Sequence, residues 1–278
     1  MLGKRVKTCR GRWTALGLSL GLASGLLACR QASDRSCNFQ SNGLKSDGWN
    51  GQDLADKELA LIFLKGPSKQ TSPIGSFLSG LDVKAAFFAQ GATIEGNTSE
   101  LQSLKDQGHL VGNSGYHYAD LVQANHPVLE LRTTDALITP YITGNQFVFY
   151  APFKSFNEQM SALFRTNGLG KYVGPIKDDT LPSATFQYDE QCWSQELTVA
   201  ACTQQYFDEI QRLGRGIVAF HDTESKTLEL LNLLVPQLSV VGYNFVRLDQ
   251  IPGVRTALAR AGGELDLTGG SASCDDYD

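Results

Sequence analysis

The sequence predicts an α/β fold in which helices cover a parallel β-sheet, and three features favour this class. The apolar runs are short and nearly continuous, as in strands that are buried on both faces. Segments with helical patterning separate these runs along the chain. Strands that alternate with helices are typical of a parallel sheet. An open sheet and a closed barrel both fit this pattern.

The predicted elements follow one another from residue 60 to residue 248. Strands are expected at 60–63, 84–89, 110–112, 147–150, 184–188, 216–220 and 245–248. Helices are expected at 73–81, 99–107, 127–142, 156–164, 198–213 and 228–241. Gly108 directly follows the second helix, where glycine commonly ends a helix. Together these elements make one folded unit.

The first 28 residues have the composition of a bacterial export signal. Residues 1–12 carry five basic residues and no acidic one, and residues 13–28 carry no charge. A basic start, a short apolar core and a small residue before the cut are typical of such signals. Residues 26–29 read Leu-Leu-Ala-Cys, which resembles a bacterial lipobox, so we expect Cys29 to be lipidated and to anchor the protein to a membrane. The alternatives are an uncleaved anchor helix, and ordinary cleavage nearby with Cys29 incidental.

Composition and charge narrow the class of partner. The chain is 42% hydrophobic and 19% charged, which is typical of a packed globular protein. Without the signal, the 24 basic and 29 acidic residues become 19 and 29, a net charge of −10. This charge argues against nucleic acid or an anionic polymer as the main partner. Neutral glycans and cationic ligands remain open.

Four cysteines lie outside the signal region: Cys37, Cys192, Cys202 and Cys274. An exported chain can keep disulfides, and four cysteines allow three connectivities. Closeness in sequence favours a Cys192–Cys202 bond, which leaves Cys37 to pair with Cys274. The chain has no Cys-x-x-Cys spacing, which argues against a zinc ribbon.

The chain divides into four predicted segments. The signal peptide at 1–28 is followed by a polar tether at 29–56, which is rich in Ser, Asn, Gly and Asp. The folded domain is expected at 57–255. A glycine-rich and acidic tail is expected at 256–278.

In folds of this class the chemistry lies at the C-terminal ends of the strands, and the segments found there carry a resemblance. Residues 62–68 read Ile-Phe-Leu-Lys-Gly-Pro-Ser, and residues 84–88 read Lys-Ala-Ala-Phe-Phe. Residues 108–121 run from Gly-His-Leu-Val-Gly-Asn to Ala-Asp-Leu, and residues 216–222 end in Phe-His-Asp. In order, and over residues 57–250, these segments resemble the NodB-homology polysaccharide deacetylases, which are carbohydrate esterase family four.

The resemblance implies a distorted (β/α) barrel that removes N-acetyl groups from chitin-like glycans or peptidoglycan. It also implies a divalent metal, usually zinc, held by one Asp and two His, with a second Asp as base and a late His as acid. In such a site the metal polarises the acetyl carbonyl and acidifies a water, the base takes its proton, and the acid protonates the leaving amine. With the export signal, the resemblance predicts a protein of the bacterial cell envelope with a glycan as partner.

Position by position, the residues of this metal site are replaced. Leu64 stands at the base position, and Lys65, Ser114 and Tyr118 stand at the three ligand positions. A leucine cannot take a proton, and a protonated lysine repels a cation. Neutral hydroxyls are poor zinc ligands compared with imidazole. We therefore expect no metal or other cofactor.

Two other family positions are kept. His221 matches the acid, and Asp189 matches the first Asp of the family's D-x-x-D-W motif, whose second Asp is replaced by Cys192. His221 is expected to have one of two roles. It faces the cleft as a remnant acid, or it is a structural histidine that forms hydrogen bonds at the end of a strand. Without a base and a metal, the structural role is favoured.

Lys65 has two alternatives. In the first, its ammonium lies about where the metal would be, bonded to Ser114 or Tyr118 and paired with Asp189 or Asp222. In the second, it points to solvent. An unpaired buried charge would be costly, so the first alternative requires a partner.

The histidines offer one route to a rebuilt metal site. His117 lies one residue before the ligand position of Tyr118, and Asp120 or His126 are the candidates to join it. No fixed ligand spacing supports this site. His109 is expected to be structural, and without such a site His126 is a surface residue.

The aromatic residues near the strand ends predict a sugar-binding groove: Trp193, Tyr150, Phe153, Tyr116 and Tyr118. Sugar rings stack their C–H faces on aromatic rings, so such a groove can outlast lost catalysis. The alternative is a site that is filled and merely packed.

The sequence as a whole predicts an envelope lipoprotein that is inactive in metal-dependent deacetylation and acts as a glycan-binding or scaffold protein. The first alternative is an active hydrolase that removes N-acetyl groups from a chitin-like or peptidoglycan glycan through a rearranged site. The second alternative is a structural, partner-binding lipoprotein. Fold alone does not decide between them.

Overall fold

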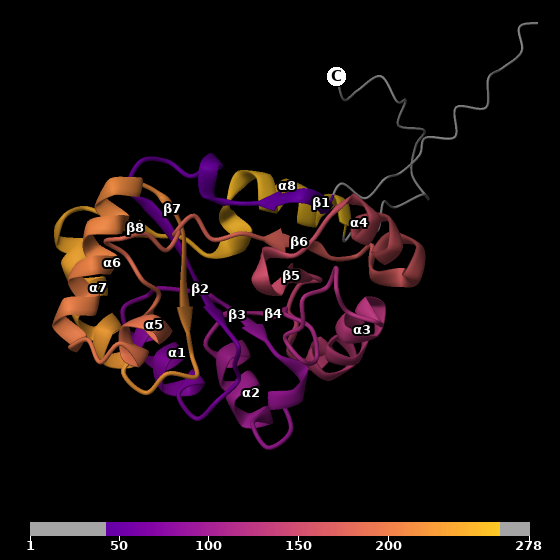
Figure 1. The fold of residues 1–278 in the computed structure, drawn as a ribbon, viewed down its shortest axis with the longest axis horizontal. Coiled ribbons are helices and arrows are strands. Elements are labelled where there is room, and N and C mark those ends of the chain that lie inside the picture. Colours follow the sequence, from indigo (N-terminus) through magenta and orange to yellow (C-terminus); the bar gives the residue numbers. More distant parts are fainter. Residues whose placement is uncertain (1–42, 262–278) are drawn as a thin grey trace, which may run out of the picture. The chain divides into compact units, whose positions relative to one another are not determined.

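Eight parallel strands form the central sheet of the computed structural model, which describes residues 43–261 (Figure 1). The strands are β1 (Leu44–Trp49), β2 (Glu58–Leu64), β3 (Ala86–Ala89), β4 (Leu110–Asn113), β5 (Val148–Tyr150), β6 (Val173–Ile176), β7 (Gly216–His221) and β8 (Asn244–Phe245). Their order is β1-β6-β5-β4-β3-β2-β7, and β8 also pairs with β2. Every pairing is parallel. The strands therefore present their C-terminal ends at one edge.

Strand β2 shows why the strand sequences are continuously apolar. Leu59, Leu61 and Phe63 pack in one core cluster with residues of the surrounding helices. Their neighbours Ala60, Ile62 and Leu64 belong to a second cluster, with Phe88 and other residues of the sheet's opposite face. Successive side chains of a strand point to opposite faces, so both faces of β2 are buried. The second cluster fills the interior of the curled sheet, as in a small barrel.

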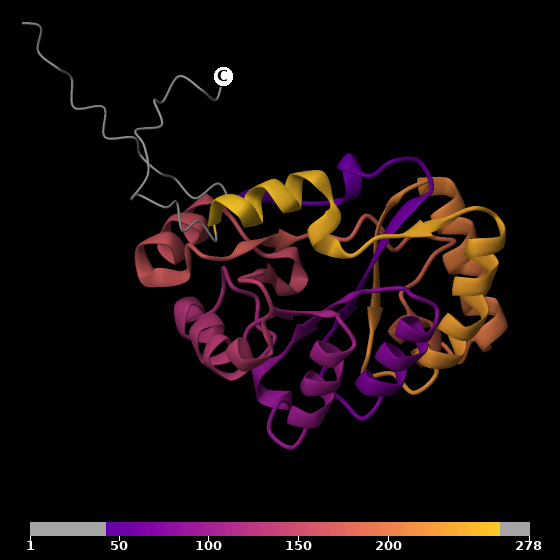
Figure 2. The ribbon, with the colours of Figure 1, turned by 180° about the vertical axis from the view of Figure 1, so that it is seen from behind.

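Eight α-helices cover this sheet; the first seven lie around its outside, and the last packs on the interior cluster (Figures 1 and 2). They are α1 (Thr71–Gly80), α2 (Thr98–Asp106), α3 (Pro127–Ile138), α4 (Glu158–Phe164), α5 (Asp189–Ser194), α6 (Val199–Leu213), α7 (Thr227–Val240) and α8 (Pro252–Ala261). In α6 the buried residues Cys202, Tyr206 and Ile210 recur at the spacing of one helix face. Thr198 caps its first turn by accepting a hydrogen bond from the backbone N–H of Ala201 (3.1 Å).

Asp179, which follows β6, joins the two sides of the barrel where the strand order ends. Its backbone N–H donates to the carbonyl of Ile217 in β7 (2.8 Å). Its Oδ2 accepts from the backbone N–H of Ile217 (2.8 Å) and of Gly51 (2.9 Å). Asp179 thus links the segments after β1 and β6 to β7, where no strand pairing within residues 43–261 closes the barrel. Of the two expected alternatives, an open sheet and a barrel, the structure shows a distorted (β/α) barrel.

Most expected elements are present, with boundaries shifted by a few residues. The expected strand at 184–188 is wrong, because these residues form a loop that leads into α5. The sixth position of the barrel is filled instead by β6, which the sequence analysis missed. Gly174 and Pro175 interrupt its apolar pattern. In place of a single helix at 127–142, α3 ends at Ile138 and a separate 3₁₀ turn, Thr139–Tyr141, follows.

Two expected boundaries of the folded domain differ from the structure. Strand β1 lies within the expected tether at 29–56 and pairs with β6. Its polar sequence shows no strand pattern, because it is an edge strand in which only Leu44 is fully buried. Helix α8 continues beyond the expected boundary at 255 and buries Val254, Ala257 and Leu258 against the interior cluster. The signal peptide, Cys29, Cys37 and Cys274 lie outside the described residues.

Between residues 43 and 261, no helix combines the length and the apolar character that a membrane span requires.

Candidate functional site

The C-terminal ends of the strands bring most of the predicted site residues to the mouth of the barrel. Leu64 ends β2 and is in register with Phe88 of β3 and with His221 of β7. Lys65 is the next residue after β2, Ser114 follows β4, and Tyr150 ends β5. The parallel register makes these neighbours in space although they are far apart in sequence.

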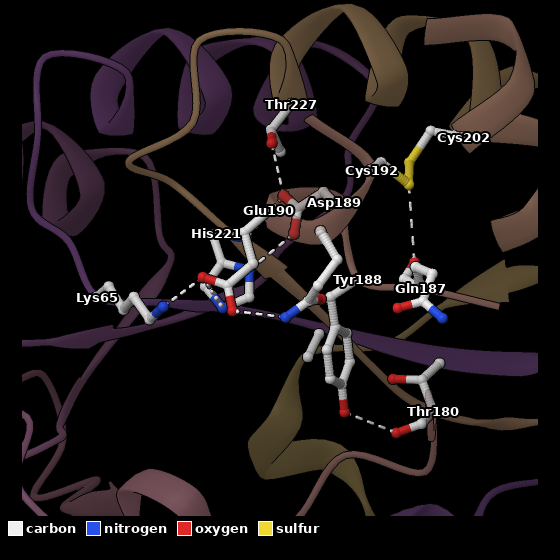
Figure 3. Close-up of polar contacts among 12 residues, drawn as sticks. Lys65, Thr180, Gln187, Tyr188, Asp189, Glu190, Cys192, Cys202, His221 and Thr227 are labelled. Atoms are coloured by element: carbon white, nitrogen blue, oxygen red, sulfur yellow. Dashed lines mark hydrogen bonds and ion pairs between the residues drawn. A yellow bond between two sulfur atoms is a disulfide. The ribbon is translucent and has the colours of Figure 1, made fainter. Parts of the chain in front are cut away.

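An ion pair between Lys65 and Glu190 lies at the centre of this mouth (Figure 3). The Lys65 ammonium donates to Oε2 of Glu190, which stands in the first turn of α5. The same Oε2 lies 3.7 Å from Nε2 of His221. This corrects the expected partners of Lys65, because the pair forms with Glu190 and not with Asp189 or Asp222. Lys65 does contact Tyr118, whose ring centroid is 5.6 Å from Nζ.

His221 and Asp189 form a buried pair behind Glu190. Nδ1 of His221 lies 2.7 Å from Oδ1 of Asp189, and the two side chains are 4% and 0% exposed. Oδ2 of Asp189 accepts from the His221 backbone N–H (3.0 Å) and from the Thr227 hydroxyl (2.5 Å). Asp189 therefore fixes the imidazole and joins the end of β7 to the start of α7.

The charge state of His221 follows from two opposed effects. Burial lowers the pKa of His221, but the hydrogen bond and charge of Asp189, with the charge of Glu190, raise it. The pKa of His221 lies above its ordinary value of 6.5 as a result. The imidazole is thus held toward its protonated form, with Nε2 directed at Glu190. Both expected roles of His221 stay compatible with this geometry.

The residues at the family's metal positions do not fit a divalent metal. Ser114 is fully buried, and its hydroxyl donates to the carbonyls of Ala89 (2.9 Å) and Phe88 (3.2 Å). Leu64 is 3% exposed and packs in the interior cluster. Lys65 contributes a cation. Over residues 43–261 no group of three His, Cys, Asp or Glu side chains has the arrangement to hold a metal ion.

A second acid–lysine pair, which the sequence analysis missed, lies beside the first. Asp178 follows β6, its side chain is fully buried, and Lys154 Nζ lies 3.3 Å from its carboxylate. The Tyr188 hydroxyl donates to Asp178 Oδ2 (2.6 Å), and the Thr180 hydroxyl adds a longer contact of 3.2 Å. Asp178 was missed because β6 was not predicted, and a residue is expected at the mouth only when it follows a predicted strand.

The tyrosines around these acids stay protonated. Burial raises the pKa of Tyr118, and the charges of Glu190 and Asp178 raise it further. Burial and the charge of Asp178 likewise raise the pKa of Tyr150 and of Tyr188. Each phenol therefore remains a neutral hydrogen-bonding group at physiological pH.

The structure brings together only part of the predicted aromatic groove. The rings of Tyr118 and Phe153 contact each other edge to face, with centroids 5.9 Å apart, and Phe153 is 69% exposed. Tyr150 is buried beneath the mouth and packs on Phe88. Trp193 packs against the outer core cluster and not against Tyr118.

The histidines considered for a rebuilt metal site do not converge. His117 is exposed, and its Nδ1 lies 2.7 Å from Glu130 on α3. Asp120 is bonded to Ser155, and His126 is the exposed residue that precedes α3. The structure thus separates the three residues.

His109 has the expected structural place. Its Nδ1 accepts from the backbone N–H of Ala85 (3.0 Å), and its Nε2 lies 3.0 Å from the carbonyl of Gly75. Burial lowers the pKa of His109 to about 4. The neutral imidazole therefore joins β3 to α1.

Two further features support the loop segments of the mouth. The Cys192–Cys202 disulfide, the pair that closeness in sequence favours, ties α5 to α6. Asp222, next to His221, is 1% exposed and accepts from the Thr71 hydroxyl at the start of α1 (2.5 Å). A Cβ added to Gly66 would lie 2.0 Å from the Asp222 carboxylate, so the loop after β2 packs directly on this acid.

Comparison with known proteins gives consistent matches. The model of the polysaccharide deacetylase family matches residues 51–171. A peptidoglycan-N-acetylglucosamine deacetylase, PgdA of Listeria monocytogenes, is 22% identical over 217 residues, which are 74% of this chain and 41% of that protein. A chitin deacetylase of Arthroderma benhamiae is 27% identical over 110 residues, 37% of this chain and 29% of that protein. The chain thus spans less than half the length of these relatives.

Solved structures share the fold at low sequence identity. The chitin deacetylase from Colletotrichum lindemuthianum superimposes with a TM-score of 0.59 at 22% identity, over 72% of this chain and 89% of that one. A CE4 family pseudoenzyme from Bacillus anthracis has a TM-score of 0.57 at 21% identity, over 70% of this chain and 65% of that one. A mutant of that pseudoenzyme is described as having restored enzymatic activity. One fold therefore carries both deacetylases and a pseudoenzyme.

Proposed function

The chain belongs to the polysaccharide deacetylase family, and we propose that it is a member that binds a glycan without metal-dependent deacetylation. One observation carries the proposal: the Lys65 ammonium stands at a metal-ligand position and is paired with Glu190. The ion-paired Lys65 side chain supplies positive charge within the mouth and repels a metal cation.

The neighbouring replacements act in the same direction. The Ser114 hydroxyl donates its hydrogen bond to backbone carbonyls, and the Leu64 side chain has no atom that can accept a proton. The raised pKa of Tyr118 keeps its oxygen protonated and so a poor ligand. Together these residues remove the groups that would activate a water for attack on an acetyl carbonyl.

Glycan binding is supported by what remains at the mouth. Phe153 exposes its ring beside the half-buried Tyr118, and this exposed ring offers a face on which a sugar ring can stack. The relatives are named for peptidoglycan and chitin, which are both N-acetylated glycans. We extend this substrate class to the present chain as a binding partner.

The envelope location and the lipid anchor are part of the same proposal. The Leu-Leu-Ala-Cys stretch ending at Cys29 supports lipidation after export. Expression in a bacterium should give a protein whose mass includes acyl chains and which fractionates with membranes. Cys29→Ser should remove both properties. An unacylated wild-type protein would contradict the anchor and leave the site proposal intact.

Calorimetric titration with zinc tests the site proposal without a guess at the substrate. The purified chain, with its disulfide intact, should bind no stoichiometric zinc, and it should bind chitotetraose. Tight one-to-one zinc binding would overturn the pseudoenzyme proposal. No binding of any glycan would instead favour a structural, partner-binding role.

A second candidate is an active hydrolase, and the intact His221–Asp189 pair is the observation that favours it. That pair can donate a proton to a leaving amine. Acetate release from chitotetraose that survives a chelator and is lost in His221→Ala would establish this candidate. We expect no acetate release.

A further inference from the structure

The backbone at the barrel mouth is strained at four neighbouring places. Over residues 43–261 eight residues other than glycine have positive φ, and four of them are Lys65 (73°), Tyr118 (56°), Phe153 (57°) and Lys154 (57°). Such conformations are uncommon outside glycine and cost about 1 kcal/mol or more each. The four residues come from the loops after β2, β4 and β5. Strain that gathers from three loops at one place is typical of a functional site.

The side chains of three of these residues, Lys65, Tyr118 and Phe153, adjoin one another. The Tyr118 ring is the link, because its centroid lies 5.6 Å from Lys65 Nζ and 5.9 Å from the Phe153 ring. Lys154 directly follows Phe153 in sequence. Lys154 pairs in turn with Asp178 (3.3 Å), whose charge, like that of Glu190, raises the pKa of Tyr118.

Each lysine is held by a carboxylate that is less exposed than itself. The side chains of Lys65 and Lys154 are each 33% exposed, whereas those of Glu190 and Asp178 are 27% and 0% exposed. An ammonium group has three N–H donors, and each lysine directs one of them to its carboxylate. The outer face of the site therefore presents ammonium N–H groups beside aromatic rings.

We propose that Lys65, Lys154, Tyr118 and Phe153 form a binding site for a sugar residue that carries a carboxylate within an otherwise neutral glycan. The inference rests on the proposed glycan-binding function and names the chemical class of the glycan. Ammonium groups make strong charge-assisted hydrogen bonds to a carboxylate, and the rings supply a stacking surface. The two carboxylates keep both lysines in place before the ligand arrives.

The whole-chain charge limits the ligand to isolated carboxylates. After removal of the signal the chain carries −10, which repels a polyanion. Within the site each lysine is also partly neutralised by its own acid. One carboxylate per binding event is therefore favoured over a run of charges. A cationic amino sugar would meet the two ammonium groups first and be repelled.

Four tetrasaccharides test the proposal by calorimetry on the full chain. The first is neutral chitotetraose, and the second alternates N-acetylglucosamine with glucuronate. The third alternates N-acetylglucosamine with N-acetylmuramic acid, whose carboxylate sits on a lactyl ether, and the fourth is the fully de-N-acetylated, cationic chitosan tetramer. We expect one or both carboxylated sugars to bind about tenfold tighter than chitotetraose, because charge-assisted bonds add to the stacking. The two carboxylated probes distinguish the source of the carboxylate.

Substitution of the two lysines tests whether they cause the preference for carboxylated sugars. Lys65→Gln and Lys154→Gln should each lose the preference for carboxylated sugars, so that each variant binds them no more tightly than it binds chitotetraose. Lys69→Gln is the matched control, because Lys69 is an exposed lysine on the same loop as Lys65. It should keep the preference. Thermal unfolding of each variant shows that the fold is kept.

The outcomes separate the two proposals. Equal affinity for neutral and carboxylated sugars, or a preference for the chitosan tetramer, would overturn the carboxylate site and leave glycan binding in place. A preference that persists in both lysine variants would also overturn it. Absence of binding to all four sugars would overturn the proposed function together with this inference.

Discussion

The Lys65 ammonium and the Glu190 carboxylate pair across the mouth of the barrel, from the residue after β2 to the first turn of α5. The same carboxylate faces Nε2 of His221 at 3.7 Å. One acid thus connects Lys65, which stands where the resemblance has a metal ligand, to His221, which matches the family's acid. The charges of the mouth compensate one another within the chain.

Removing the charge of Glu190 should lower the pKa of His221. Glu190 is one of the charges that raise this pKa, after the larger effect of Asp189. Glu190→Gln should therefore shift the midpoint of the His221 imidazole to lower pH in an NMR titration. Glu196→Gln, at an exposed position just after α5, should leave the midpoint in place. An unchanged midpoint in Glu190→Gln would show that the two side chains are not coupled.

Zinc binding should appear when the family residues are restored together. The set Leu64→Asp, Lys65→Asp, Ser114→His and Tyr118→His supplies a base and three ligands at the strand ends. Asp and His tolerate positive φ better than most residues, which suits the backbone at Lys65 and Tyr118. Calorimetry should show one zinc per chain. The matched control keeps three of the changes and places alanine at 114.

Circular dichroism decides whether this experiment is informative, since an aspartate at the buried position of Leu64 costs stability. A folded variant that binds no zinc would show that the mouth differs from the family site by more than these four side chains.

Asp222 should make the stability of the fold depend on pH. Burial raises the pKa of Asp222 from 3.8 to about 6. Its stabilising contribution is fully present below pH 3.8 and is lost as pH rises through about 6, because the unfolded chain then releases the proton more readily. Asp222→Asn stays neutral at every pH. Relative to this variant, the unaltered chain should lose about 2 kcal/mol of unfolding free energy between pH 4 and pH 7.

Urea denaturation at the two pH values measures this difference. Asp208→Asn, which changes an exposed acid on α6, is the control and should show almost none of it. A stability difference between Asp222→Asn and the unaltered chain that does not change with pH would contradict a raised pKa.

The Cys192–Cys202 disulfide should stabilise the fold by a modest amount. The bond closes a short loop, since the cysteines are 10 residues apart. Loop-closure entropy predicts a loss of about 3 kcal/mol when both cysteines are replaced by serine. The double variant should unfold at a lower urea concentration than the oxidised chain. If the double variant is as stable as the oxidised chain, the loop is fixed by packing alone.

The sequence by itself determined the class of fold and the residue types that stand at the family's metal positions. Alternating apolar and helical segments predicted the parallel sheet with its helices, and the matches at the strand ends predicted the distorted barrel. The chemistry of Leu64, Lys65, Ser114 and Tyr118 follows from residue type alone, because no placement turns a leucine into a base. Closeness in sequence was also enough to favour the Cys192–Cys202 bond.

Only the tertiary structure decided which residues meet at the mouth. Strands β1 and β6 carry weak patterns, since β1 is a polar edge strand and Gly174 and Pro175 interrupt β6. Their place in the sheet comes from pairing with distant strands. Glu190 became the partner of Lys65 because residues 184–188 form a loop and Glu190 begins a helix. Likewise, the pairing of Lys154 with Asp178 joins loops far apart in the chain, which local sequence does not encode.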